Sequence, residues 1–175
     1  WWGSLSAIGF MAVPMLFASP NQINAQLPFN VDGSATMVLR TPGGVSDNYY
    51  LTILPAAPSV FRSEAGPLTD VPTVLRSKNG ELVTGSNPIH PDEALVIFLT
   101  GLGRTEPALE AGLPAPCEPL ARAVIEPQVT LGGVPLMVGY AGLAPGQVGV
   151  YQINCWVPGN VPEGMEIPLE IAQGG

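Results

Sequence analysis

The sequence of 175 residues contains very little positive charge. It has six Lys and Arg residues, of which Lys78 is the only lysine, against 14 Asp and Glu residues, and its formal net charge is −8. Binding to nucleic acid or to an anionic membrane surface depends on clustered Lys and Arg side chains. The sequence therefore predicts neither of these partners.

Residues that commonly perform catalysis are also scarce. The only histidine, His90, lies in a proline-rich loop, and no G-x-S-x-G motif accompanies it, so a hydrolase triad cannot be assembled from the sequence. Glu106, Glu110 and Glu118 share one loop, but scattered carboxylates in an acidic chain are usually solvated. We expect the protein not to be an enzyme.

Metal ligands are equally sparse. One histidine and two distant cysteines cannot supply the usual four-ligand zinc set. Exported β-proteins often bind calcium through loop carboxylates, but no D-x-D-x-D-G loop is present, which leaves Asp92 and Glu93 as weak candidates. The sequence predicts no cofactor, with calcium as the alternative left open.

The longest apolar run near the start, residues 7–18, is too short to cross a membrane. A spanning helix needs about 20 apolar residues, and this run contains Pro14 and follows no positively charged residue. We predict no membrane insertion and interpret the run as a pair of strands.

The two cysteines, Cys117 and Cys155, occur in a chain that is poor in lysine and rich in glycine (21) and proline (20). An even number of cysteines in such a composition is typical of an exported protein with a disulfide. We predict a Cys117–Cys155 disulfide, which would stabilise the fold by about 3 to 4 kcal/mol. Two buried free thiols are the alternative.

An internal repeat organises the chain. Residues 144–158, APGQVGVYQINCWVP, have a shortened copy in residues 19–28, SPNQINAQLP. Three further matches flank the shared Gln-Ile-Asn: residues 13–14 with 134–135, residues 17–18 with 140–141, and Pro28 with Pro158. Self-similarity of this kind indicates one folding unit used twice.

Short alternating segments separated by glycine and proline turns predict an all-β fold. Residues 94–100, ALVIFLT, are either a strand covered on both faces or a short buried helix, and their β-branched content favours the strand. Further strands are predicted at residues 5–10, 15–17, 23–27, 35–40, 48–54, 124–131, 136–140, 148–157 and 166–171, with a hairpin turn at residues 78–81.

The repeat divides the chain into two predicted Ig-like β-sandwich domains, residues 1–54 and 58–175, joined by a short linker at residues 55–57. Nothing before the first copy matches residues 59–130, so the first domain is expected to be truncated at its N-terminus. The second is expected to lack its last strand, because nothing follows residues 166–171 to match residues 48–54.

Gly101-Leu102-Gly103 after the strand at residues 94–100 could be mistaken for a nucleotide-binding loop. The third glycine of that motif is replaced by Glu106, and no helix pattern follows. We interpret the segment as a glycine turn.

Several segments resemble one known family: INAQLPFNV, FLTGLG, VTLGGVP, YAGLAPGQVGVYQINCWVP and IPLEIA. They are similar to the uncharacterised C-terminal module of acidobacterial exported proteins, a tandem of Ig-like or IPT/TIG-like domains. The resemblance covers nearly the whole chain and implies paired β-sandwiches of secreted or surface proteins, with no catalytic residues to carry over. Cys117 and Cys155 depart from the family pattern.

The sequence therefore leads to two alternative hypotheses of function. The first is a non-catalytic extracellular or cell-surface module that forms a homo-oligomer or filament when strands of neighbouring subunits complete its open sheets. The second is a carbohydrate- or surface-binding adhesion module. Exposed aromatic side chains would serve that second role, and Tyr49, Tyr50 and Trp156 are the candidates, alongside residues 1–2.

Overall fold

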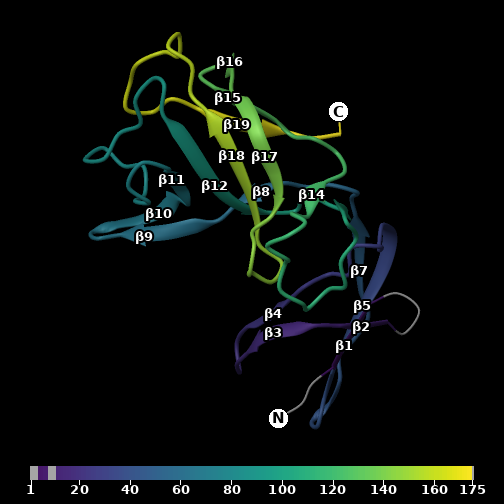
Figure 1. The fold of residues 1–175 in the computed structure, drawn as a ribbon. Coiled ribbons are helices and arrows are strands. Elements are labelled where there is room, and N and C mark those ends of the chain that lie inside the picture. Colours follow the sequence, from purple (N-terminus) through teal and green to yellow (C-terminus); the bar gives the residue numbers. More distant parts are fainter. Residues whose placement is uncertain (1–3, 8–10, 175) are drawn as a thin grey trace.

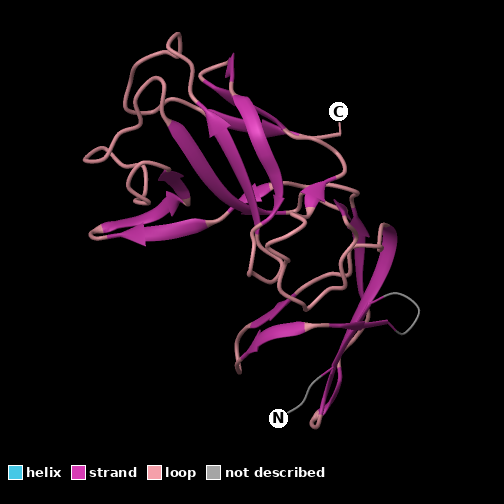
Figure 2. Ribbon diagram, in the orientation of Figure 1, coloured by secondary structure: helices cyan, strands magenta, loops and turns pink. Residues whose placement is uncertain are grey.

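The computed structural model describes residues 4–7 and 11–174, and within these ranges the chain forms strands and no helix (Figures 1 and 2). The prediction of an all-β fold is confirmed, and the arrangement of the sheets is consistent with a β-sandwich. No helix in this part of the chain could cross a membrane.

The strands gather into two lobes, which we define as the N-terminal lobe (residues 4–54) and the C-terminal lobe (residues 58–174). The strands of the N-terminal lobe are β1 (Ser4–Ala7), β2 (Met11–Val13), β3 (Met15–Ala18), β4 (Ile23–Ala25), β5 (Gly33–Thr41), β6 (Gly44–Val45) and β7 (Tyr49–Ile53). In the described ranges no strand of this lobe pairs with a strand of the other. Whether the two lobes are separate Ig-like domains remains a prediction.

The C-terminal lobe contains the remaining twelve strands of the described chain. They are β8 (Ser59–Val60), β9 (Arg62–Ala65), β10 (Leu68–Pro72), β11 (Val74–Arg76), β12 (Ala94–Thr100), β13 (Thr105–Glu106), β14 (Arg122–Ala123), β15 (Gln128–Leu131), β16 (Val134–Pro135), β17 (Met137–Leu143), β18 (Tyr151–Trp156) and β19 (Leu169–Ala172). The β9–β10 hairpin, which projects from the lobe in Figure 1, is not among the predicted strands.

Two sheets of the C-terminal lobe enclose the main core. The larger has the order β11-β12-β18-β17-β14-β13, with β8 beside β12, and the smaller has the order β16-β15-β19. Alternate residues of β12 and β18 point inwards, as period-2 patterning requires, so Ile97 and Ile153 are fully buried. The core cluster combines such residues with Val129 and Leu131 of β15.

The N-terminal lobe has a far smaller core. Its five-stranded sheet, β2-β1-β5-β6 with β7 beside β5, is accompanied by the separate β3–β4 hairpin. Val13 is buried against the partly buried side chains of Met15, Met37 and Leu39. This lobe therefore buries little of its own apolar surface.

The two lobes share the same strand pairing in the segments that the repeat predicts. The order β2-β1-β5 matches β16-β15-β19, and the β3–β4 hairpin matches β17–β18. Phe17 is opposite Asn24 just as Tyr140 is opposite Asn154, and a register irregularity precedes each of these pairs. Residues 22–24 and 152–154 therefore match in their position within a sheet as well as in sequence.

The linker docks against the glycine turn that follows β12. Gly101 and Gly103 have positive φ angles of 85° and 76°, and a Cβ atom on either would collide with the carbonyl oxygen of Ala57 or Pro55. The backbone N–H of Ala57 also donates to the carbonyl oxygen of Gly101 over 2.8 Å. This turn therefore needs glycine for close backbone approach.

Contacts of three side chains also join the two lobes. The buried Gln26 accepts a hydrogen bond at Oε1 from the backbone N–H of Gly112, over 2.7 Å. Phe29 packs edge-on against Tyr151 with ring centroids 6.5 Å apart, and Arg104 pairs with Asp32 at 2.8 Å. These contacts fix the segment after β4 against the C-terminal lobe.

Candidate functional site

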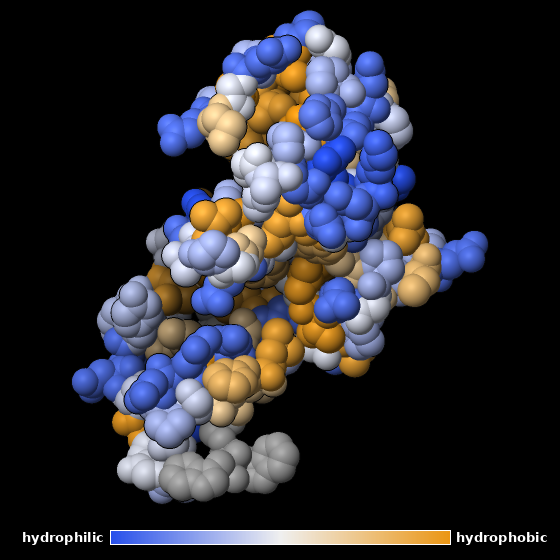
Figure 3. Space-filling model, turned by 90° about the vertical axis from the view of Figure 1, so that its left-hand side faces the viewer, coloured by the Kyte–Doolittle hydropathy of each residue, from blue (hydrophilic) through white to orange (hydrophobic). Residues whose placement is uncertain are grey.

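An apolar groove lies between the two lobes of the described structure. We call it the interlobe groove; it has a volume of about 800 Å³, and its walls are formed by residues 24–29, 51–55 and 148–151, with further residues from β3, the linker and the turn after β12. In Figure 3 apolar residues gather around a hollow in the middle of the face shown. None of the described residues that line the groove is charged.

One wall of the interlobe groove contains a strand with an open edge. β4 pairs with β3, and no other described strand pairs with it. The backbone N–H of Gln26 points to the β3 side, where it donates to the carbonyl oxygen of Pro14 over 3.0 Å. Because backbone groups alternate in direction along an antiparallel strand, Ile23 and Ala25 direct their N–H and C=O groups away from β3.

The matching strand of the C-terminal lobe has both edges occupied. β18 pairs with β17 on one side and with β12 on the other, where Leu95 is opposite Cys155 and Ile97 is opposite Ile153. Ile153 is 0% exposed and Cys155 2%. Their counterparts in β4, Ile23 at 36% and Ala25, are both exposed. Exposed side chains in β4 thus accompany an edge at which no described strand takes the place of β12.

The three predicted aromatic candidates do not form one platform. Tyr49 and Tyr50 are 63% and 74% exposed on β7, whereas Trp156 is half exposed at the end of β18, in another sheet. Trp156 faces outwards and Cys155 inwards. Tyr49 and Tyr50 are adjacent in a strand that pairs with β5 alone among the described strands, so neither is covered.

The predicted Cys117–Cys155 disulfide is wrong, because both cysteines are free thiols in the structure. Cys155 points from the middle of β18 into the core, while Cys117 lies exposed in the loop between β13 and β14. Burial raises the pKa of the Cys155 thiol to about 12. Cys155 therefore packs as an inert apolar side chain.

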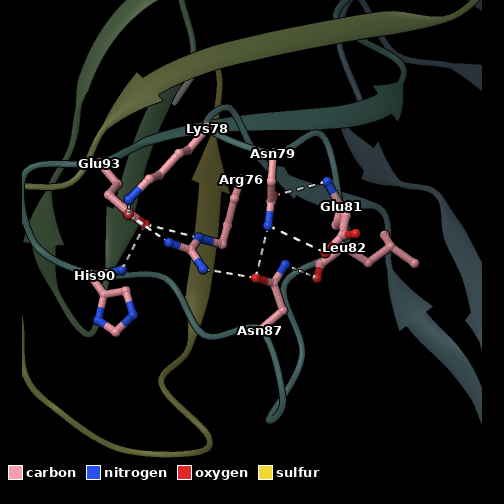
Figure 4. Close-up of polar contacts among 8 residues, drawn as sticks. All are labelled: Arg76, Lys78, Asn79, Glu81, Leu82, Asn87, His90 and Glu93. Atoms are coloured by element: carbon pink, nitrogen blue, oxygen red, sulfur yellow. Dashed lines mark hydrogen bonds and ion pairs between the residues drawn. The ribbon is translucent and has the colours of Figure 1, made fainter.

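His90 is exposed in the loop before β12 and forms no catalytic arrangement there. Its backbone N–H donates to Glu93 Oε2 over 3.3 Å. Figure 4 shows that the nearby polar groups bond to one another. Arg76 Nε and Nη2 donate to the two oxygens of Glu93 over 3.0 and 2.6 Å, and Nη1 donates to Asn87 Oδ1 over 2.8 Å.

This polar cluster braces the loop between β11 and β12. Asn87 Nδ2 donates to the carbonyl oxygen of Leu82 over 2.9 Å, and Asn79 Nδ2 donates to Asn87 Oδ1 over 3.1 Å. The hydrogen bonds from Arg76 hold the pKa of Glu93 below its ordinary value, although partial desolvation opposes them. With the strongest donors and acceptors already paired, the cluster is structural.

The acidic candidates for calcium are not brought together. Among the described residues no group of three or more His, Cys, Asp or Glu side chains is arranged to hold a metal ion. Glu93 is already paired with Arg76. Asp92 and Glu93 therefore do not act together as two calcium ligands. Glu106 follows Thr105 on β13, and Glu110 and Glu118 belong to the loop after it.

No family model, curated protein or solved structure matches this chain. The open edge of β4 and the interlobe groove are therefore the features from which a function has to be inferred.

Proposed function

We propose that the protein is a non-catalytic extracellular structural module that assembles into a filament or other homopolymer by strand complementation between subunits. The observation that carries this proposal is the open edge of β4, where Ile23 and Ala25 are exposed although their counterparts Ile153 and Cys155 are buried. Unpaired strand edges readily accept a strand from another chain.

The distribution of exposed apolar side chains supports assembly. Among the residues whose exposure is described, nine of the 18 exposed large hydrophobic side chains lie within residues 11–54, which make up about a quarter of the chain. They are Met11, Leu16, Phe17, Ile23, Leu27, Val45, Tyr49, Tyr50 and Leu54. Concentrations of exposed apolar surface of this kind usually mark an interaction site.

A second open edge in the C-terminal lobe supports a polymer over a closed pair. β19 pairs with β15 alone in the described ranges, whereas its counterpart β5 pairs with β1, β6 and β7. The open edges of β4 and β19 provide two different contact sites per subunit. Contacts between unlike surfaces generate open chains unless the rotation closes a ring.

The experiment is sedimentation velocity over a hundredfold range of protein concentration, with negative-stain electron microscopy of the most concentrated sample. We expect the sedimentation coefficient to rise with concentration and regular polymers to be visible. A single monomer boundary at every concentration contradicts self-assembly.

A carbohydrate-binding or adhesion role is the second candidate, and the exposure of Tyr49 and Tyr50 favours it. Two adjacent aromatic side chains on an edge strand offer apolar faces on which sugar rings could stack. A glycan array would test this role. Binding should be lost in Tyr49→Ala or Tyr50→Ala and retained in Val45→Ala, a change at an equally exposed site on the neighbouring β6.

A further inference from the structure

We propose that the open edge of β4 is an acceptor site for an uncharged, extended segment with large aliphatic side chains at alternate positions. This inference rests on the proposed strand complementation and specifies its acceptor strand and the chemistry of its donor. The donor is a segment of another polypeptide that pairs antiparallel with Ile23–Ala25 along the interlobe groove.

The C-terminal lobe shows how such a segment would be seated. β12 pairs antiparallel with β18 over six consecutive positions, from Ala94 opposite Trp156 to Leu99 opposite Tyr151. Since β3–β4 repeats the register of β17–β18, the same pairing carried over to β4 places one donor residue opposite Ala25 and another opposite Ile23. These are the positions that Leu95 and Ile97 occupy against β18.

The backbone groups of β4 already have the orientation that this pairing requires. Ile23 and Ala25 direct their backbone groups to the open side, and each would form the paired N–H···O=C bonds of an antiparallel ladder. Directly after β18, Val157 has the same direction: it donates to the carbonyl oxygen of Glu93 and accepts from the N–H of Asp92, over 2.9 and 2.8 Å. The acceptor edge therefore needs no rearrangement of the β3–β4 hairpin.

The residues around the open edge of β4 indicate which side chains the donor should have. Leu95, Ile97 and Leu99 of β12 are at most 2% exposed and form the centre of the core. A donor beside β4 would likewise direct alternate side chains towards the N-terminal core around Val13, and large aliphatic residues fill such positions best. The opposite face of the donor would meet the interlobe groove.

The lining of the groove excludes a charged donor. None of its residues is charged, and burying an unpaired charge there would be strongly unfavourable. Two of its polar groups are already bonded within the protein, because Gln26 Oε1 accepts from the N–H of Gly112 and the Tyr151 hydroxyl donates to the carbonyl oxygen of Gly103. An apolar strand would cover apolar surface on both of its faces.

The test uses a synthetic peptide with the sequence of residues 94–100, labelled with a fluorophore and flanked by lysines for solubility. The control peptide has serine at the positions of Leu95, Ile97 and Leu99. We expect saturable binding of the first peptide to the full chain, measured by fluorescence anisotropy, and at least tenfold weaker binding of the control. Hydrogen exchange should slow in residues 23–25 when the first peptide is bound.

Matched variants test whether the peptide binds at β4. Ile23→Lys and Ala25→Pro should each weaken peptide binding at least tenfold, because the first adds a charge at the edge and the second removes an outward N–H donor. Val45→Lys adds the same charge at an exposed site on β6 and should bind like the wild type. Unchanged thermal unfolding of each variant confirms that it is folded.

The outcomes separate this inference from the proposed function. A protein that stays monomeric but binds the peptide at β4 supports the acceptor site and overturns self-assembly. A protein that polymerises, yet neither binds the peptide nor responds to Ile23→Lys, supports self-assembly and overturns the acceptor site. Equal binding of the two peptides also overturns it, since the alternation of aliphatic side chains would then not matter.

Discussion

Ile23 and Ile153 occupy the same position in two matching strand pairs, but Ile23 is 36% exposed and Ile153 is fully buried. Ala18 is opposite the first and Ala141 is opposite the second, so the strand on one side is the same in both lobes. One difference lies on the other side, where Ile153 is opposite Ile97 of β12. Nothing described in the N-terminal lobe takes the place of β12.

This pair of isoleucines predicts unequal effects of the same substitution. Ile153→Ala removes buried methyl groups from the core and should lower the free energy of unfolding by about 2–5 kcal/mol. Ile23→Ala in the dispersed monomer should change it by roughly 0.5 kcal/mol or less, as at other exposed sites. Urea unfolding of both variants at low protein concentration checks this, and equal costs would show that Ile23 is already covered.

The glycines of the linker contact should resist substitution. Gly101→Ala requires a side chain at φ 85° and drives its Cβ into the carbonyl of Ala57. Strained backbone alone costs about 1–3 kcal/mol, so the loss should be at the upper end of that range or beyond. Gly80→Ala is the control, since Gly80 has φ 71° but open space around it. If both variants unfold at the same temperature, the linker contact contributes nothing.

The two thiols should react very differently with an alkylating reagent. Cys117 is exposed, whereas Cys155 is buried and its pKa is raised to about 12 by desolvation. Mass spectrometry after iodoacetamide treatment at pH 8 should show one modified cysteine in the native protein and two after denaturation without reductant. No modification under either condition would instead indicate the disulfide that composition suggested.

The raised pKa of Cys155 also predicts a loss of stability at high pH. The thiol is neutral in both states below its ordinary pKa of 9.0, so its burial then carries no ionisation cost. Between pH 9.0 and about 12 the unfolded chain loses this proton and the folded chain keeps it, so unfolding becomes more favourable. Cys155→Ala should flatten the fall in melting temperature over that window, and an unchanged profile would contradict a buried thiol.

The pairing of Arg76 with Glu93 should stabilise the loop before β12 most at neutral pH. Because the pKa of Glu93 is lowered from its ordinary 4.5, its contribution is present above that value and is lost as the pH falls through the lowered pKa. Glu93→Gln should lower the melting temperature at pH 7, and the difference from wild type should shrink below pH 4.5. A constant difference would show that the charge of Glu93 is unimportant. Glu81→Gln is the control at an exposed carboxylate.

The repeat and most strands of the fold follow from local patterns. Residues 94–100 form the predicted strand, with Leu95, Ile97 and Leu99 buried on one face and their neighbours half-buried on the other. The shared Gln-Ile-Asn motif marks strands of equal register in the two lobes. These features depend on side-chain alternation and turns, which a single sequence displays directly.

The features that escaped prediction depend on how distant segments meet. Cysteine count and composition suggested a disulfide, but neither reveals that Cys155 points into the core while Cys117 lies on an exposed loop. Gly101 and Gly103 were recognised as a turn, but their contact with the linker could not be read from the motif. No sequence pattern predicted the interlobe groove. The alignment of Ile23 with Ile153 was nevertheless a signal for the open edge of β4.

Light scattering of the wild-type chain and the Ile23→Lys variant, side by side at the same concentrations, tests the central claim most directly. Strand complementation at β4 predicts that the wild type grows with concentration into particles many times the monomer mass of 18.2 kDa, while the variant stays monomeric. Two clean monomers would contradict self-assembly. Equal growth of both samples would contradict assembly through the edge of β4.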